Sequence, residues 1–244
     1  MADWQDAALP VRLDAVNNRG PSTDKPLRVP IDASSSVSAL LRVPAQAKAC
    51  YVLAHGAGAG MAHPFMQAIA EGLADRGMAT LRFQFPFMEL GSKRTDRPAV
   101  AHAAIRAACQ VARKKTGVPL IAGGKSFGGR MTSQAQALEP LAHVAGLAFL
   151  GFPLHMPDKP SSERALHLDD VKVPMLFIQG TRDKLAEFQR ISDLAVHLGK
   201  RATLLPIEHA DHGFDVLVRS GRKPEEVLRE VLDGLTSWIV TLAK

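Results

Sequence analysis

The sequence is poor in cysteine and tyrosine, and it contains no long apolar run. Its two cysteines, Cys50 and Cys109, are too few for a disulfide framework and favour a reducing compartment, so we expect the cytoplasm. No apolar run approaches the roughly 18 residues that cross a bilayer. The first residues also lack the apolar core of a signal peptide. We therefore expect no membrane partner.

The formal net charge of +6 raises the question of an anionic macromolecular partner. The basic residues are scattered in short groups at expected helix ends and loops, and the single tyrosine excludes an interleaving of basic and aromatic residues. A solvated surface is the better interpretation, so we expect no nucleic-acid partner. With 46% hydrophobic and 22% charged residues, the composition is that of a globular protein, and 244 residues suit one α/β domain or two small ones.

Short apolar runs alternate with segments of helical periodicity along the chain. Strands that are apolar throughout are typical of a mostly parallel sheet with helices on both faces. Without a repeat or linker, we predict a single domain over residues 26–244 after an N-terminal arm, residues 1–25, that we expect to be poorly ordered. We expect strands at 27–31, 38–43, 49–54, 78–85, 118–122, 144–150, 173–179 and 202–207, helices at 64–76, 98–116, 131–138, 185–198 and 224–242, and irregular segments at 86–97 and 152–170.

One stretch carries the clearest chemical signal, the run Gly124-Lys125-Ser126-Phe127-Gly128 between a predicted strand and a predicted helix. Its Gly-x-Ser-x-Gly pattern is typical of a nucleophile elbow, a sharp strand-to-helix turn that exposes a serine hydroxyl. Glycine on both sides of the serine permits tight packing of the strand on the helix. Ser126 is therefore the candidate nucleophile, and simple capping of the following helix is the competing interpretation.

The partners of Ser126 are expected just past strand ends, because ligands of open parallel sheets bind outside the carboxyl ends of the strands. Asp183 is the first acid after the strand at 173–179, and His212 follows the strand at 202–207. The order serine, acid, histidine is that of one known type of catalytic triad. Other candidates stay open at this point: Glu187 and Asp158 as the acid, His209 as the base, and a helix-capping role for Asp183.

These residue types suit acyl transfer. A serine hydroxyl is a weak nucleophile near neutral pH, so an imidazole with a pKa near about 6.5 must take its proton during attack. A carboxylate fixes the tautomer of that imidazole. The oxyanion of the tetrahedral intermediate needs two preorganised N–H donors. We expect one from Phe127 and the other from Ala57 or Gly58, in the glycine-rich loop after the strand at 49–54.

Three other motifs nearly fit and fail. A P-loop needs a glycine five residues before Gly124, where Pro119 stands. The dinucleotide fingerprint that starts at Gly56 needs a glycine where Met61 stands. The histidines after the last strand lack the first member of a metallo-hydrolase motif, because that position is Ile207. We therefore expect neither a cofactor nor a metal.

Five motifs, at residues 53–61, 82–86, 123–130, 179–183 and 211–214, together resemble the α/β-hydrolase superfamily. Within it, the chain is similar to a branch of small, lidless predicted hydrolases that is close to the dienelactone hydrolase-like group. The resemblance covers the chain from about residue 27 onward. It implies the α/β-hydrolase fold, a mostly parallel eight-stranded sheet with helices on both faces and a first antiparallel strand.

The resemblance also bears on the site. In such proteins the histidine that follows an acid and precedes a small residue and a phenylalanine is the base, which selects His212 over His209. A cap, where present, is inserted after the sixth strand. Here that place holds only residues 152–172, too few for a cap domain, so the resemblance implies an open site.

Two functional hypotheses follow. The first is a serine hydrolase that cleaves a small-molecule carboxylic ester or thioester through an acyl-enzyme, with Ser126 as nucleophile, His212 as general base and Asp183 as the orienting acid. The second is a catalytically silent interaction module on the same fold, as distant relatives in a chromatin-acetylating complex suggest. The complete set of triad residues favours the enzyme.

Other residues close to Ser126 in sequence, or just past strand ends, are candidates for a substrate pocket. Lys125 and Arg130 would favour an anionic substrate such as a carboxylate or a CoA thioester, unless Lys125 is solvated and Arg130 pairs with an acid. Apolar residues at loop starts would form an acyl pocket, with core packing as the alternative: Phe85, Phe87, Met88 and Phe152.

Overall fold

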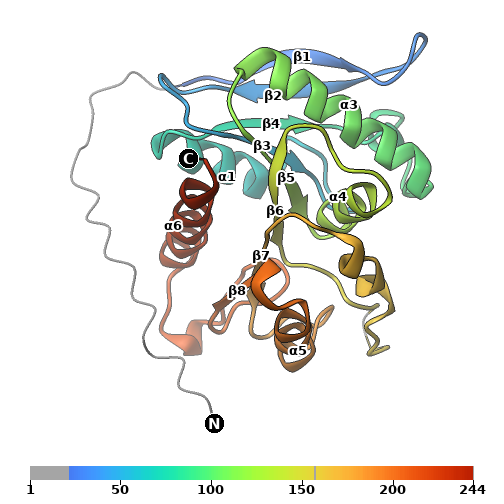
Figure 1. Cartoon of the computed structure of the whole chain (residues 1–244). Helices are drawn as coiled ribbons and strands as arrows, with labels where there is room; N and C mark the ends of the chain where they lie inside the picture. Colours follow the sequence, from blue (N-terminus) through green and yellow to red (C-terminus); the bar gives the residue numbers. More distant parts are fainter. Residues whose placement is uncertain (1–21, 157, 244) are drawn as a thin grey trace.

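An eight-stranded sheet runs through the molecule in the computed structural model, which describes residues 22–156 and 158–243 (Figure 1). The strands follow the order β1-β2-β4-β3-β5-β6-β7-β8, and all neighbouring pairs from β4 to β8 are parallel. Their bounds are β1 (Lys25–Pro30), β2 (Ser36–Arg42), β3 (Cys50–Ala54), β4 (Ala79–Phe83), β5 (Leu120–Lys125), β6 (Val144–Leu150), β7 (Met175–Gly180) and β8 (Ala202–Ile207).

The mostly parallel sheet is confirmed, but the reversed strand is the second one and not the first. β2 is antiparallel to both of its neighbours, β1 and β4. β1 and β2 are joined by a tight turn at Asp32, whose carboxylate accepts hydrogen bonds from the backbone N–H groups of Ser34 and Ser35, both at 2.8 Å. A turn this short joins only antiparallel strands.

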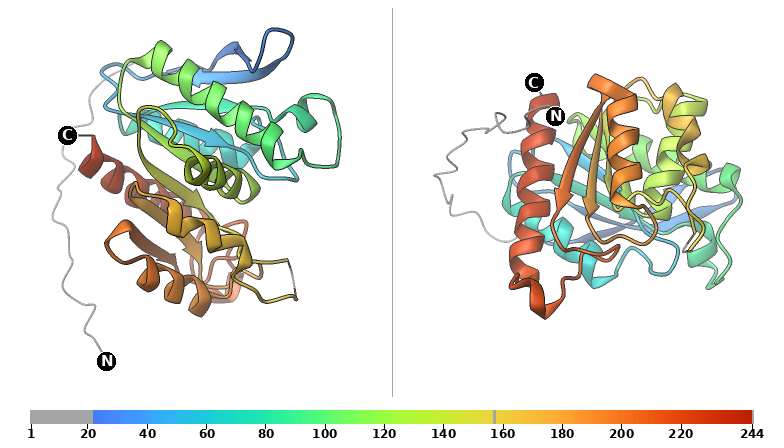
Figure 2. Two further views of the ribbon diagram at one scale, coloured as in Figure 1. Left: turned by 45° about the vertical axis from the view of Figure 1, so that its right-hand side comes forward. Right: turned by 90° about the horizontal axis from the view of Figure 1, so that it is seen from below.

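Helices cover both faces of the sheet (Figure 2). One face carries α1 (Pro64–Asp75) and α6 (Pro224–Leu242). The opposite face carries α3 (Pro98–Thr116), α4 (Phe127–Leu138), α5 (Phe188–Leu198) and the 3-10 helix η1 (Glu163–Asp170). Three short helices complete the described chain: α2 (Pro86–Glu89), η2 (Gly199–Arg201) and η3 (Val218–Ser220).

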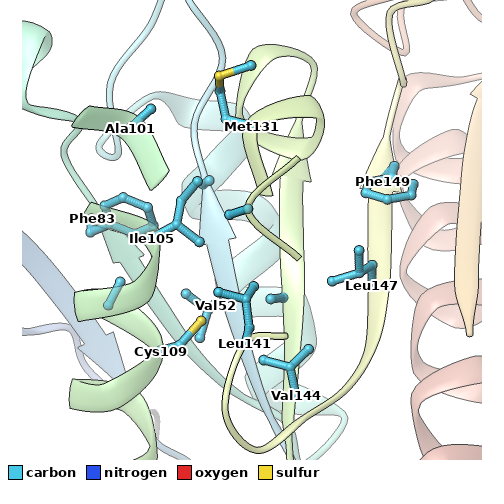
Figure 3. Close-up of a cluster of buried hydrophobic side chains, with 14 of the residues drawn as sticks. Val52, Phe83, Ala101, Ile105, Cys109, Met131, Leu141, Val144, Leu147 and Phe149 are labelled. Carbon is cyan, nitrogen blue, oxygen red and sulfur yellow. The ribbon is translucent and has the colours of Figure 1, made fainter. Parts of the chain in front are cut away.

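Each face has its own apolar core, because strand side chains alternate between the two faces. Under α3 and α4, the side chains of Ile105, Cys109 and Met131 pack toward Val52 and Leu147 from the sheet (Figure 3). The α1 and α6 side forms a second cluster around the other set of strand residues. The two cores hold the sheet rigidly, so the loops at its carboxyl edge have a fixed base.

Several predicted elements match the structure closely, in particular α3, α6, β6 and β8. Two differences concern the site.

First, β5 extends to Lys125 and α4 begins at Phe127, so a single residue separates the strand from the helix. The strand can continue this far because Gly123 and Gly124 lack a Cβ, which would overlap backbone atoms of β6 and β3. The segment 86–97, predicted to be irregular, begins with α2, which a proline starts and a buried Phe87 anchors.

The predicted N-terminal arm lies mostly outside the described residues, since residues 1–21 are not described. Its last part is attached to the sheet: the Asp24 carboxylate binds the guanidinium groups of Arg42, at 2.9 Å, and of Arg82. Between β6 and β7 the structure contains only η1 and irregular chain, so no separate cap domain is evident there. In the described part of the chain, no helix is both long and apolar enough to cross a membrane.

Candidate active site

Ser126 stands alone between the end of β5 and the start of α4. Its backbone is in a sparsely populated conformation, φ 50° and ψ −114°, which a non-glycine residue adopts only when its surroundings hold it there. Gly124 and Gly128 permit this turn, because a Cβ at either position would collide with the carbonyl oxygen of Ala54. The hydroxyl makes no capping hydrogen bond to α4, so the capping interpretation of Ser126 is wrong.

The structure brings Ser126, His212 and Asp183 together in one hydrogen-bonded chain. His212 Nε2 lies 2.8 Å from Ser126 Oγ, and His212 Nδ1 lies 2.7 Å from Asp183 Oδ2. A carboxylate only accepts hydrogen bonds, so Nδ1 carries the proton and Nε2 presents its lone pair to the serine hydroxyl. The Asp183 side chain is fully buried and that of His212 is 24% exposed, so the chain leads from the interior to the surface.

Gln179, near the end of β7, holds the carboxylate of Asp183 in place. Its Nε2 donates to Asp183 Oδ2 at 2.6 Å, while its Oε1 accepts the backbone N–H of Phe152 at 2.8 Å. The other oxygen of Asp183 accepts the backbone N–H of Leu185 at 2.7 Å, so the residue also organises the turn before α5. Sequence analysis did not single out Gln179, although a polar side chain in an otherwise apolar strand is a usable signal.

The alternative partners lie elsewhere. Glu187 pairs with Arg190 at the start of α5, and Asp158 is exposed in the segment between β6 and η1. The exposed residue His209 uses its backbone N–H to bind the hydroxyl of Thr181, at 2.9 Å. None of the three is hydrogen-bonded to Ser126 or His212 in the described structure.

The side chain of Lys125 supports the loop of His212. Its ammonium donates a hydrogen bond to the backbone carbonyl of His212 and lies 5.2 Å from the ring centroid of Phe214 and 6.0 Å from that of Phe65. Burial lowers the pKa of Lys125 to about 8, against the opposing attraction of Asp183 and two further aspartates, Asp211 and Asp215. One of its three N–H donors is thus used within the protein.

The glycine-rich loop after β3 is tied down at both ends. At its start, His55 Nε2 accepts the backbone N–H of Phe85 at 2.9 Å, so Nδ1 carries the proton and donates to the carbonyl of Gly56 at 2.7 Å. Burial lowers the pKa of His55, which favours this neutral form. At its end, the backbone of Met61 makes two hydrogen bonds. Its N–H donates to Gln84 Oε1 at 2.8 Å, and its carbonyl accepts a hydrogen bond from the Arg82 side chain at 3.1 Å.

This anchoring presents free backbone donors beside the serine. Within the described residues, no acceptor is hydrogen-bonded to the N–H groups of Phe127, Ala57 or Gly58. The N–H of Phe127 belongs to the first turn of α4, where helical partners are missing. The loop comes near Ser126 at Gly56, where an added Cβ would lie 3.9 Å from Cβ of Ser126. A second oxyanion donor from Ala57 or Gly58 stays a prediction.

The predicted acyl-pocket residues differ in their exposure. Phe152 is fully buried and packs against Phe149 and Phe177 in the core, so its ring offers no surface to a ligand. Phe87 is 3% exposed and packs edge-on against Phe127, with ring centroids 6.0 Å apart. Phe85 is also fully buried, so Met88 alone of the four is partly exposed.

A second serine–histidine pair lies inside the protein, and its hydrogen bond runs in the opposite direction. Ser133 Oγ is 2.7 Å from His167 Nε2 and 2.9 Å from the carbonyl of Arg130. The carbonyl can only accept, so the hydroxyl proton points to it and His167 donates to Ser133. This histidine therefore does not act as a base toward Ser133.

The described residues offer no cluster of three or more metal-binding side chains. The two cysteines are free and buried, and burial raises the pKa of Cys50 and of Cys109 to about 12 in each case. Both are held as neutral thiols, which are poor nucleophiles and poor metal ligands.

Comparisons with known proteins agree with this architecture. The model of a family described as an alpha/beta hydrolase domain matches residues 47–240. A dienelactone hydrolase from Anabaena variabilis has 21% identity and a TM-score of 0.74, covering 92% of this chain and 100% of that one. A serine hydrolase without a lid from Xanthomonas campestris has 20% identity and a TM-score of 0.69, with 91% and 98% covered. Est1E from Butyrivibrio proteoclasticus has 17% identity and a TM-score of 0.63, with 86% and 98% covered. At such identities the likeness shows the fold.

Proposed function

The chain belongs to the alpha/beta hydrolase family, and on that premise we propose that it is a serine hydrolase that cleaves a carboxylic ester or thioester through an acyl-enzyme. The observation that carries the proposal is the chain of hydrogen bonds from Ser126 Oγ through His212 to Asp183. It gives the serine a base of the right tautomer and gives the base a buried carboxylate that stabilises its protonated form.

In the proposed first half-reaction, Ser126 Oγ attacks the carbonyl carbon while its proton passes to His212 Nε2. The carbonyl oxygen becomes an oxyanion, held by the N–H of Phe127 and that of Ala57 or Gly58. The imidazolium then gives its proton to the departing alkoxide or thiolate as the carbon–oxygen or carbon–sulfur bond breaks. The acyl group remains on Ser126.

In the second half-reaction, water replaces the alcohol or thiol. His212 takes a proton from the water, whose oxygen attacks the acyl carbon. The second tetrahedral intermediate uses the same N–H donors. It breaks down to a carboxylic acid as His212 returns the proton to Ser126, which restores the free enzyme.

The names of similar proteins fit this chemistry without fixing the substrate. A dienelactone hydrolase opens a lactone, which is an internal ester, and one structure of Est1E is described with ferulic acid bound. No separate cap domain is evident between β6 and β7 in the described chain, which supports substrates whose acyl or alcohol part extends from the surface.

Steady-state hydrolysis of a chain-length series of neutral 4-nitrophenyl esters, together with acyl thioesters, tests the proposal. We expect turnover by the native protein and none above background by the Ser126→Ala variant. Equal rates for the two proteins would overturn the role of Ser126. No turnover across the whole series would instead favour the silent interaction module.

A further inference from the structure

Two arginines lie side by side on the α4 and η1 side of the nucleophile without a negative partner. Arg130 follows Ser126 by about one helical turn, and Arg164 is on η1. The guanidinium carbon of Arg130 lies 6.0 Å from the ring centroid of Phe127. Its Nε is buried and has no hydrogen-bond partner, whereas Arg164 Nη1 donates to the carbonyl of His155 at 3.1 Å. No carboxylate of the described chain pairs with either.

Other arginines that are buried to a similar or greater degree are treated differently. Several of them reach a carboxylate, which offsets the cost of removing the charge from water. These arginines are Arg42 and Arg82, which share Asp24, Arg76, which binds Asp233, and Arg222, which binds Glu230. Two others, Arg113 and Arg201, have no carboxylate but donate to backbone carbonyls. Arg130 differs from all of these because its guanidinium is hydrogen-bonded to no acceptor in the described structure.

The charges around the pair are mostly positive, although Asp170 attracts the neighbouring His167. Burial and the charge of Arg164 both lower the pKa of Arg130. Burial and the charge of Arg130 lower the pKa of the neighbouring His167 to about 4, so this side chain is neutral near pH 7. Two neighbouring guanidinium charges without a carboxylate repel each other, and an anion that binds to both would offset that repulsion.

The position of Arg130 links this positive charge to the site of attack. Long side chains on a helix point back toward its N-terminus, and the N-terminus of α4 is Phe127, directly after Ser126. The guanidinium therefore lies over the first turn of α4, beside the ring of the residue whose N–H is the expected oxyanion donor. The opposite side of Ser126 is occupied by Lys125, which is already bonded to His212.

We propose that Arg130 and Arg164 form a subsite for an anionic group of the substrate, a carboxylate or a phosphate, a few bonds away from the scissile carbonyl. The subsite rests on the proposed function, because it takes Ser126 as the centre of attack. The forked guanidinium groups match two oxygens of such a group.

Kinetics with matched substrates test the subsite. The native protein should prefer 4-nitrophenyl hydrogen adipate, or acyl-CoA, over an uncharged counterpart, methyl 4-nitrophenyl adipate or the acyl N-acetylcysteamine thioester. We expect Arg130→Met and Arg164→Met each to reduce the charged-to-neutral ratio of kcat/KM by about 10-fold to 100-fold, the effect of one charge-assisted hydrogen bond. Arg130→Lys should keep part of the preference. Arg229→Met, on the exposed surface of α6, is the matched control and should keep the native ratio.

The two substrate pairs distinguish the sources of the anion. A preference confined to the adipate pair identifies a carboxylate in the acyl part, and one confined to the thioester pair identifies the phosphates of the leaving group. An unchanged ratio in both arginine variants, across both pairs, would overturn the subsite.

A binding experiment separates this result from the proposed function. Calorimetric titration of the Ser126→Ala variant with monomethyl adipate and with inorganic phosphate requires no turnover. Binding of one of them that weakens at least about 10-fold on adding Arg130→Met supports the subsite even if no ester is hydrolysed. If neither anion binds while neutral esters are hydrolysed, the subsite is wrong and the proposed function stands.

Discussion

The two sides of Ser126 differ in how the protein treats a positive charge. On the α1 and α6 side, Lys125 is bonded to the backbone of His212 and packed between Phe65 and Phe214. On the α4 and η1 side, Arg130 lies next to Arg164. The buried Nε–H of Arg130 is hydrogen-bonded to nothing in the described structure. Two cations that look equivalent in sequence therefore have different surroundings: Lys125 is bonded to the backbone of His212, and Arg130 is proposed to bind an anion of the substrate.

The largest effect should come from the proposed orienting acid, Asp183. Asp183→Asn removes the acceptor that fixes the tautomer of His212, so we expect kcat for a neutral ester to fall about 10,000-fold while the fold is retained. Asp158→Asn, which changes the alternative acid, should leave kcat at the native value. The reverse pattern in steady-state assays would show that Asp183 was assigned wrongly.

A smaller effect is expected for Lys125→Met, which removes the donor to the backbone of His212 but keeps an apolar stem between the two phenylalanines. Loss of a hydrogen bond from a charged group is worth about 1.5–3 kcal/mol, so kcat should fall about 10-fold to 100-fold with little change in KM. Arg130→Met should instead act through KM for charged substrates. If Lys125→Met raised KM for charged esters and left kcat unchanged, the contrast between the two sides would be lost.

The pH dependence of stability sharpens the same contrast. Burial holds the pKa of Lys125 at about 8, below the ordinary lysine value of about 10.5, so above pH 8 the native state releases a proton that the unfolded chain retains. The unfolded state then binds more protons, and the free energy of unfolding rises with pH over this window. Relative to Lys125→Met, the native protein should gain about 1–3 kcal/mol between pH 8 and pH 10.5, and nothing below pH 7. Urea unfolding at several pH values measures this, and a difference that does not vary with pH would contradict it.

The smallest effect concerns the stability of the protein after a change at Arg130, on the α4 and η1 side of Ser126. Arg130→Met removes a half-buried charge that has no carboxylate partner, so we expect it to stabilise the protein by about 1 kcal/mol in the absence of ligand. Arg229→Met removes the same charge from an exposed part of α6 and should change stability by less than about 0.5 kcal/mol. Thermal unfolding in low-salt buffer compares them. A clear destabilisation by Arg130→Met would mean that Arg130 has a structural partner.

Much of this architecture could be predicted from the sequence, because the candidate catalytic residues directly follow the ends of strands. Asp183 and His212 were found by asking which residues follow β7 and β8, and the structure brings both to Ser126. The bounds of α3 were equally accessible, since a proline opens the helix and Gly117, at φ 70°, closes it. Local rules were sufficient for these features.

The side-chain contacts that could not be predicted depend on which face of the sheet a residue lies on and on how the strands pair. Gln179 looks like the polar end of an apolar strand until the pairing of β6 with β7 brings it to Phe152 and Asp183. Lys125 and Arg130 are five residues apart, yet the turn at Ser126 directs them to opposite faces. The anchoring of Met61 by Gln84 likewise needs the parallel pairing of β3 with β4.

The central claim is that Ser126 is the nucleophile, and covalent labelling tests it most directly. Treatment with a fluorophosphonate, followed by intact-mass and peptide mass spectrometry, should show one adduct per chain, on Ser126, and none on the Ser126→Ala variant. The rate of labelling should fall in Asp183→Asn, because the base is then no longer held in the right tautomer. An adduct on Ser133, or equal labelling of the native protein and Ser126→Ala, would contradict the account.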